Sequence, residues 1–152
     1  MANQQVPYSV TLLSATTVTS ATVVNGTAIE FPTDLDSGTF YLAVTAPTGT
    51  TETINVEIQV SPDNSTWFRR WSFTQVTTAA VSHAIDVCFS RLATAGAITT
   101  VTPATAAHTD TAVVANAVLP KYVRTSYICA GTNPSYGTVK VFFVGHRDCP
   151  AY

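Results

Sequence analysis

The sequence is short and carries few charges. Its 152 residues include seven Lys and Arg and nine Asp and Glu, so 11% of the chain is charged and the formal net charge is −2. Typical soluble domains have about 25% charged residues. With 46% hydrophobic residues, the chain lacks the polar, highly charged composition of a disordered segment, and its length suits one domain with its own core.

The same composition excludes two classes of partner. Seven basic residues spread along the chain provide no continuous basic surface for phosphates, so we expect no nucleic-acid partner. The chain has no run of 18 apolar residues, and its N-terminus lacks the basic and apolar regions of a signal peptide. We therefore expect no membrane partner and synthesis in the cytoplasm.

Period-two alternation and many β-branched residues predict strands along the whole chain. In chain order, the predicted strands lie at residues 8–13, 17–24, 28–31, 40–45, 54–60, 67–74, 81–89, 98–101, 111–114, 122–130 and 138–145. The clearest strand is 54–60, whose four apolar residues should face a core while Asn55, Glu57 and Gln59 face outward. A Ser-Pro-Asp-Asn-Ser turn over residues 61–65 joins it to 67–74, which predicts a hairpin.

These strands predict an all-β fold. No segment has the 3.6-residue periodicity of a helix, and short strands separated by turns are typical of a β-sandwich or jelly roll. We expect a single domain over residues 1–152, with no internal repeat or linker. Three segments should extend from it: an N-terminal arm at 1–10, a long excursion at 93–119 and a C-terminal tail at 145–152.

No motif in the sequence defines a reacting site. The histidines His83, His108 and His146 could join a serine and a carboxylate, but no G-x-S-x-G or other signature selects a nucleophile. We therefore predict a protein that is not an enzyme and holds no cofactor.

Possible metal ligands and thiols are equally sparse. Residues 146–149 bring His, Asp and Cys into one tail, whereas zinc normally takes four ligands from separate elements. Asp34 and Asp36, with Glu30 nearby, lack calcium-loop spacing and fit a turn. We expect no metal. The cysteines Cys88, Cys129 and Cys149 form neither a disulfide framework nor a CxxC pattern, and we interpret Cys88 and Cys129 as small buried apolar residues.

The densest aromatic and basic cluster is Trp-Phe-Arg-Arg-Trp at residues 67–71. In a regular strand, Trp67, Arg69 and Trp71 would share one face, and Phe68 and Arg70 the other. One interpretation is a core strand whose arginines reach water or pair with carboxylates. The other two interpretations are a contact with a protein partner and a platform on which sugars or bases stack.

Several segments together resemble a known group of virus proteins. They are, in chain order, residues 25–31, 40–44, 58–67, 119–127, Gly131 and 138–144. This pattern, over roughly residues 20–145, resembles the head decoration, or cement, proteins of tailed bacteriophages, which are small jelly-roll-like domains on the outside of the capsid lattice. The resemblance implies a virion protein at the capsid surface that binds the major capsid protein and itself, as a dimer or trimer.

On this interpretation, the chain stabilises contacts between capsid subunits without catalysing a reaction. The candidate protein-binding residues are Tyr8, Trp67, Arg69, Arg70, Arg124 and Arg147. The arm, the excursion and the tail are candidate contact segments. The alternative is a glycan-binding or host-attachment β-sandwich module of a phage tail or fibre, which is motivated by the aromatic and basic residues at 67–71.

Overall fold

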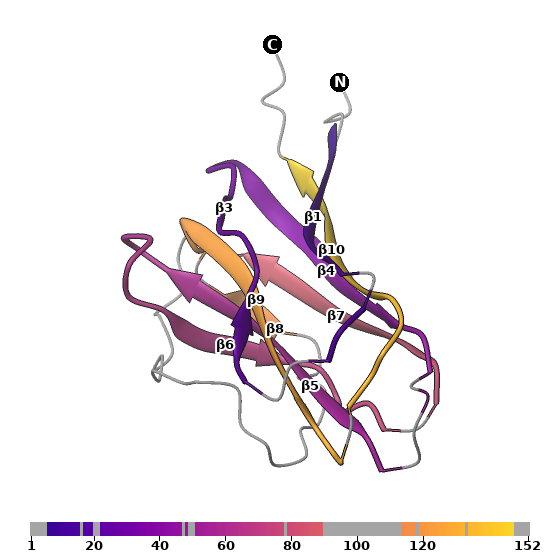
Figure 1. Cartoon of the computed structure of the whole chain (residues 1–152). Helices are drawn as coiled ribbons and strands as arrows, with labels where there is room; N and C mark the ends of the chain where they lie inside the picture. The colour runs from indigo at the N-terminus through magenta and orange to yellow at the C-terminus, as the bar shows by residue number, and fades with distance from the viewer. Residues whose placement is uncertain are drawn as a thin grey trace.

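A computed structural model gives the fold and describes residues 6–15, 17–19, 22–46, 48, 51–77, 79–89, 114–117, 119–132 and 134–147. These residues form ten β-strands and no helix. The strands build two sheets that pack face to face (Figure 1), which confirms the predicted all-β sandwich. No helix in the described ranges is long and apolar enough to cross a membrane.

The first sheet combines strands from the beginning, middle and end of the chain. Its order is β1 (Val6–Ala15), β10 (Val139–Arg147), β4 (Leu35–Val44), β7 (Val81–Phe89) and β8 (Val114–Ala117). The first four strands are antiparallel neighbours, and the short β8 runs parallel to β7 at the edge. The pairing of β1 with β10 joins the first described strand to the last.

The second sheet is built around two long central strands. They are β5 (Thr53–Ser61) and β9 (Tyr122–Ala130), which are antiparallel along their whole length. On one side β6 (Phe68–Ser72) pairs with β5, which confirms the predicted hairpin. On the other side β2 (Val24–Asn25) and β3 (Ile29–Glu30) pair with separate parts of β9.

The hairpin turn between β5 and β6 is held by Asp63. Its Oδ1 accepts hydrogen bonds from the backbone N–H groups of Ser65 and Thr66 at 2.9 and 2.8 Å. The next residue, Asn64, has a φ of 61°, a conformation that Asn adopts more readily than most residues. The turn therefore forms as the Pro-Asp-Asn sequence predicts.

One predicted strand is wrong. Among the described residues 17–19 and 22–24, Val18 forms an isolated bridge to Tyr136 and β2 begins at Val24. The chain passes from the first sheet to the second in this stretch, so it cannot pair continuously with one neighbour.

Strand boundaries also change the predicted terminal segments. β1 already begins at Val6, so residues 6–10 of the expected arm are paired with β10. β10 continues to Arg147, so the expected tail begins within a strand. The predicted strand at residues 98–101 and most of the 93–119 excursion lie outside the described residues, while β8 begins where the prediction for 111–114 ends.

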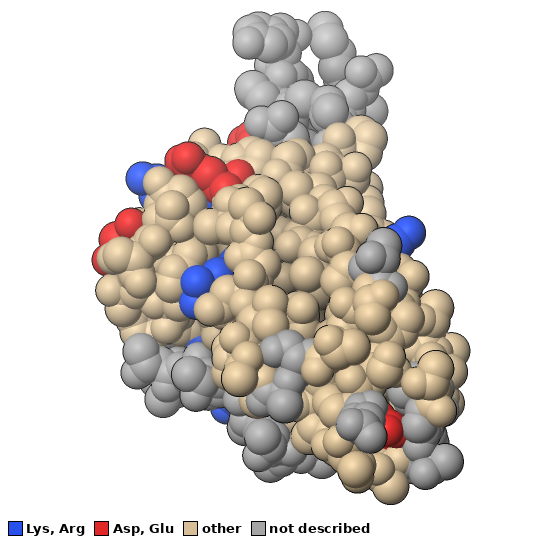
Figure 2. Space-filling view, in the orientation of Figure 1, with Lys and Arg blue, Asp and Glu red and all other residues tan. Residues whose placement is uncertain are grey.

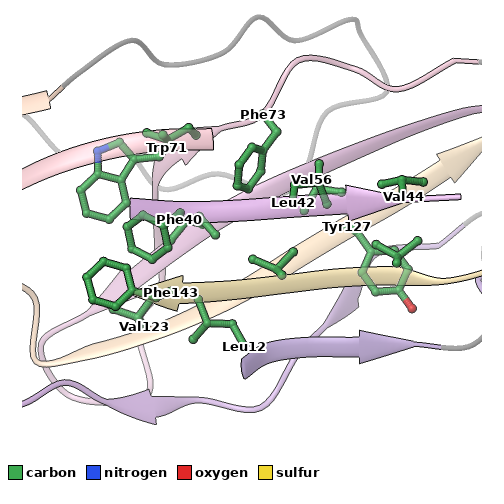
Figure 3. Packing of buried hydrophobic residues seen from close by; sticks show 14 of the residues in the cluster. Leu12, Phe40, Leu42, Val44, Val56, Trp71, Phe73, Val123, Tyr127 and Phe143 are labelled. Carbon is green, nitrogen blue, oxygen red and sulfur yellow. The ribbon is translucent and has the colours of Figure 1, made fainter. Parts of the chain in front are cut away.

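Aromatic rings fill one end of the core between the sheets. The ring of Phe143 is fully buried, with its centroid 4.7 Å from that of Phe40 and 4.9 Å from that of Phe31. Trp71 continues the row at 5.1 Å from Phe40 (Figure 3). Ring pairs at these distances stabilise the fold beyond the effect of burying their surface.

Two glycines make room for the ring of Phe143. Gly38 of β4 and Gly145 of β10 are cross-strand partners. A Cβ atom on Gly145 would lie 2.5 Å from Phe143 Cε1, and a Cβ atom on Gly38 would overlap Phe143 Cζ. Both positions therefore need a residue without a side chain.

Candidate functional site

The outer face of the second sheet carries a buried layer of polar side chains. Asn55, Glu57 and Gln59 of β5 point away from the core, as predicted, yet their exposed fractions are only 1%, 0% and 2%. Antiparallel sheets commonly have one face in water, so alternation alone does not predict this burial. Buried polar groups need hydrogen-bond partners, and longer side chains on neighbouring strands supply several of them.

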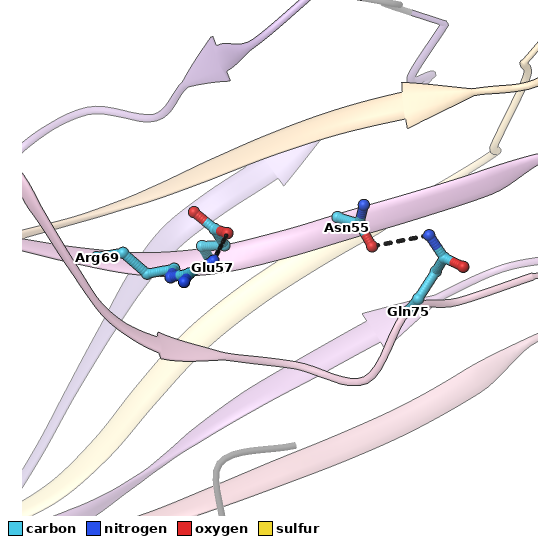
Figure 4. Close-up of polar contacts among 4 residues, drawn as sticks. All are labelled: Asn55, Glu57, Arg69 and Gln75. Atoms are coloured by element: carbon cyan, nitrogen blue, oxygen red, sulfur yellow. Dashed lines mark hydrogen bonds and ion pairs between the residues drawn. The ribbon is translucent and has the colours of Figure 1, made fainter. Parts of the chain in front are cut away.

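Two arginines lie over this layer. Arg124 of β9, Gln59 of β5 and Arg69 of β6 are cross-strand neighbours in one line. Arg124 Nε donates to Gln59 Oε1 at 2.9 Å. Arg69 Nη1 donates to Glu57 Oε1 at 3.1 Å, which pairs a side chain 35% exposed with one that is fully buried (Figure 4). We call these four residues, together with Trp67, the arginine row.

Trp67, in the turn before β6, stacks on Arg124. The centre of its ring lies 4.1 Å from Arg124 Cζ, well within the range of a cation–π contact. Burial lowers the pKa of Arg124 from its usual value, but a guanidinium group stays charged at neutral pH. The half-buried indole and the charged guanidinium thus form one surface.

The buried acceptors fix the arginine side chains before any partner arrives. Gln59 orients Arg124, and Glu57 orients Arg69, so less rotamer entropy remains to be lost on binding. The polar layer extends further through two hydrogen bonds, from Gln75 Nε2 to Asn55 Oδ1 at 3.0 Å (Figure 4) and from Ser126 Oγ to Asn25 Oδ1 at 2.8 Å. The arginine row is therefore a preorganised surface.

The structure brings together three of the predicted binding residues, Trp67, Arg69 and Arg124. The prediction that Trp67, Arg69 and Trp71 share one face of the strand is wrong. Arg69 pairs with Gln59 on the outer face, whereas Trp71 pairs with Ile58 on the core side. A β-bulge inserts Arg70 between them and shifts the alternation. Trp71 is accordingly 1% exposed, and Arg70 Cζ lies 6.0 Å from its ring.

The other predicted residues lie elsewhere. Tyr8 packs at the rim of the core, with its ring centroid 6.2 Å from that of Phe31. The side chain of Arg147 lies outside the described residues. Cys129 is buried as predicted, and burial raises its pKa to about 11. The prediction for Cys88 is wrong, because β7 turns its thiol to the exposed side of the first sheet.

A second candidate surface, the outer face of the first sheet, is open. Its side chains form four rows across β1, β10, β4 and β7: Pro7, His146, Ser37 and Cys88; Ser9, Val144, Thr39 and Asp86; Thr11, Phe142, Tyr41 and Ala84; Ser14, Lys140, Ala43 and Ser82. We call these sixteen residues the open face. At its centre the rings of Tyr41 and Phe142 stack, with centroids 4.9 Å and planes 17° apart.

No sequence motif marks the open face, although strand alternation places Tyr41 and Phe142 on the side away from the core. Near Lys140 the face ends in a shallow hollow of about 450 Å³, whose lining includes Ala43, Thr45 and Ser82. Small and hydroxyl side chains make up most of this surface, so it presents little charge.

Neither metal ligands nor relatives add to this description. Within the described ranges, no three His, Cys, Asp or Glu side chains are grouped closely enough to hold a metal ion. Comparison of the chain with protein-family models, curated protein sequences and solved structures finds no match. We therefore infer function from the chemistry of the two outer faces.

Proposed function

We propose that the chain is a virion structural protein that binds the outer surface of a phage capsid and stabilises contacts between subunits of the major capsid protein. The observation that carries the proposal is the arginine row, which is preorganised on the outer face of the second sheet. The resemblance of residues 20–145 to phage head decoration proteins supports the choice of partner.

The arginine row has the composition of a protein-binding centre. Trp and Arg are the residues most enriched among those that dominate the binding energy of interfaces. Here the indole of Trp67 and the guanidinium of Arg124 already touch, and Gln59 and Glu57 hold the two arginines from beneath. A partner therefore meets a fixed aromatic and cationic surface.

Apart from Arg69, whose charge Glu57 balances, the basic residues of this region favour an acidic partner surface. Arg69, Arg70, Lys121 and Arg124 lie on or beside β6 and β9 and make up four of the seven basic residues. In the view of Figure 2, most of the surface is uncharged and Lys and Arg form only isolated groups. Charge complementarity then favours docking where the capsid exposes carboxylates.

The strand order supports the finer assignment to a jelly roll. We count β2 and β3 as one interrupted strand and β8 as an addition. The first sheet then contains the first, eighth, third and sixth strands, and the second sheet contains the second, seventh, fourth and fifth. This interleaved order fits the eight-stranded jelly roll used by viral capsid and lectin domains. Because a fold does not define a function, the proposal relies on the arginine row.

The glycan-binding alternative is less well supported. It needs exposed aromatic rings, but Trp71 is 1% exposed and Arg124 lies over the ring of Trp67. Of the aromatic residues at 67–71, only Trp67 belongs to the arginine row. A glycan array with the full chain tests this alternative, which predicts glycan binding that is lost in Trp67→Ala.

Binding to undecorated capsids tests the proposal. The purified chain should bind to saturation at a fixed number of copies and raise the temperature at which the capsids break. Trp67→Ala and Arg124→Gln should each weaken binding by at least about tenfold, as expected for central interface residues. Glu30→Gln is the matched control, since it removes an exposed charge from the same sheet and should bind like wild type.

Two results would contradict the proposal. One is a wild-type chain that leaves both the composition and the breaking temperature of the capsids unchanged. The other is capsid binding that Trp67→Ala, Arg124→Gln and Glu30→Gln all retain in full, because the arginine row would then not be the contact.

A further inference from the structure

The open face of the first sheet has the features of an interface between proteins. Its central aromatic pair, Tyr41 and Phe142, lies between the small exposed side chains of Thr11 and Ala84 in the same row. Interface centres are enriched in aromatic residues and depleted of charges. The composition of the open face fits this pattern.

Two opposite charges flank the aromatic pair. Exposed Lys140 lies two residues from Phe142 along β10, and exposed Asp86 lies two residues from Ala84 along β7, on the other side of the row. Standard strand spacings put the two positions about 17 Å apart, with Tyr41 midway between them. The two charges are therefore too distant to pair within one chain.

The geometry also keeps both charges available to a partner. Asp86 Oδ1 accepts a hydrogen bond from Thr39 Oγ1 at 2.7 Å, which holds the carboxylate on the open face. The ion pair between Arg69 and Glu57 lies on the other sheet. Neither Asp86 nor Lys140 has an ionic partner within the described part of the chain.

We propose that two copies of this chain associate through their open faces around a two-fold axis that passes over Tyr41. The axis lies parallel to the sheet and at right angles to the line from Lys140 to Asp86. It brings Lys140 of each copy against the partner's Asp86 and places the two aromatic centres together. A two-fold interface must be complementary to itself, and one acid and one base placed evenly around an apolar centre satisfy that condition.

The size of the face sets the expected affinity. Four strands and about eight residues along each give roughly 500 Å² per copy, or about 1,000 Å² in total. This total is near the lower limit for a specific interface, so we expect reversible association with a dissociation constant on the order of micromolar. The inference does not depend on a capsid partner, because the arginine row lies on the opposite sheet.

Sedimentation velocity of the full chain across a concentration series tests this dimer. Wild type should shift from monomer to dimer with rising concentration. Asp86→Lys and Lys140→Asp each place like charges together at both symmetric contacts, and each should weaken association by about ten- to a hundredfold. The double variant D86K/K140D should restore it, and so should an equimolar mixture of the two single variants, because opposite charges meet again in both cases.

Matched controls separate this effect from a change in net charge. Glu30→Lys and Lys121→Asp make the same charge changes at exposed residues outside the open face and should associate like wild type. Thermal unfolding of each variant confirms that it is folded. The proposal is overturned if wild type stays monomeric throughout the series, if the single variants associate like wild type, or if neither the mixture nor the double variant restores the dimer.

Discussion

Replacing Gly145 with Ala perturbs the packing around Phe143 at a single atom. The added methyl group would lie 2.5 Å from Phe143 Cε1, 2.9 Å from its Cζ and 3.0 Å from Leu35 Cδ2. The buried ring cannot turn aside, because Phe31 and Phe40 pack against it at 4.9 and 4.7 Å. Overpacking of this kind costs about 1–3 kcal/mol, and we expect the free energy of unfolding to fall by about 2 kcal/mol.

A second substitution identifies the cause of that loss. Phe143→Leu removes the ring atoms that the methyl group meets, at a cost below the 3–5 kcal/mol of truncating a buried Phe to Ala. The double variant G145A/F143L should therefore be about 1–2 kcal/mol more stable than the sum of the single effects predicts. Gly38→Ala should gain less from Phe143→Leu, because its Cβ also meets the backbone oxygen of Val144 at 2.6 Å.

Urea unfolding followed by tryptophan fluorescence measures these free energies, with the slope of each transition checked for two-state behaviour. If the effects of G145A and F143L on the free energy of unfolding are additive to within about 0.5 kcal/mol, the packing described for Phe143 is wrong.

Three further expectations concern single residues. The Tyr136 hydroxyl donates to the backbone oxygens of Val76 and Thr77 at 3.2 and 3.1 Å, so Tyr136→Phe should lower the unfolding free energy by about 1 kcal/mol. The backbone hydrogen bonds to Asp63 hold the pKa of its carboxyl well below the usual value. The ionised Asp63 carboxylate therefore stabilises the folded state above about pH 4, and this stabilisation is lost on further acidification. Wild type and Asp63→Asn should accordingly differ in urea midpoint at pH 7 and converge in acid. In a Cys149→Ser background, exposed Cys88 should be alkylated rapidly in the native protein. Cys129 should be alkylated only after unfolding, because it is buried and burial raises its pKa to about 11. Mass spectrometry distinguishes the two modified cysteines.

Local periodicity predicts the fold well where a strand pairs regularly on both sides. In β5, the residues from Ile54 to Val60 alternate in sequence because successive side chains point to opposite faces of a regularly paired strand. The Asp63 turn is equally predictable, since its hydrogen bonds are local. The stretch at 17–24 has strand-like composition, but its structure depends on a crossing between sheets that composition does not encode.

The aromatic and basic members of the arginine row are recognisable in the sequence, but the acceptors that fix them, Gln59 and Glu57, are not. Trp67, Arg69 and Arg124 stand out as aromatic or basic residues, whereas Gln59 resembles an ordinary solvent-facing residue. Their juxtaposition depends on the register of three strands and on the bulge at Arg70. Register and bulges arise from pairing between distant segments, so one strand's sequence does not reveal them. The exposure of Cys88 and the stacking of Tyr41 on Phe142 depend on tertiary contacts in the same way.

Electron microscopy of capsids assembled with and without the chain tests the proposed function most directly. The account predicts added density the size of this sandwich at regular positions on the outer capsid surface, with the arginine row facing the shell. At a concentration that just saturates the capsid with wild type, the density should be strongly reduced with Arg124→Gln and retained with Glu30→Gln. Density that appears only on a tail or fibre, or an outer surface unchanged at saturating protein, would contradict it.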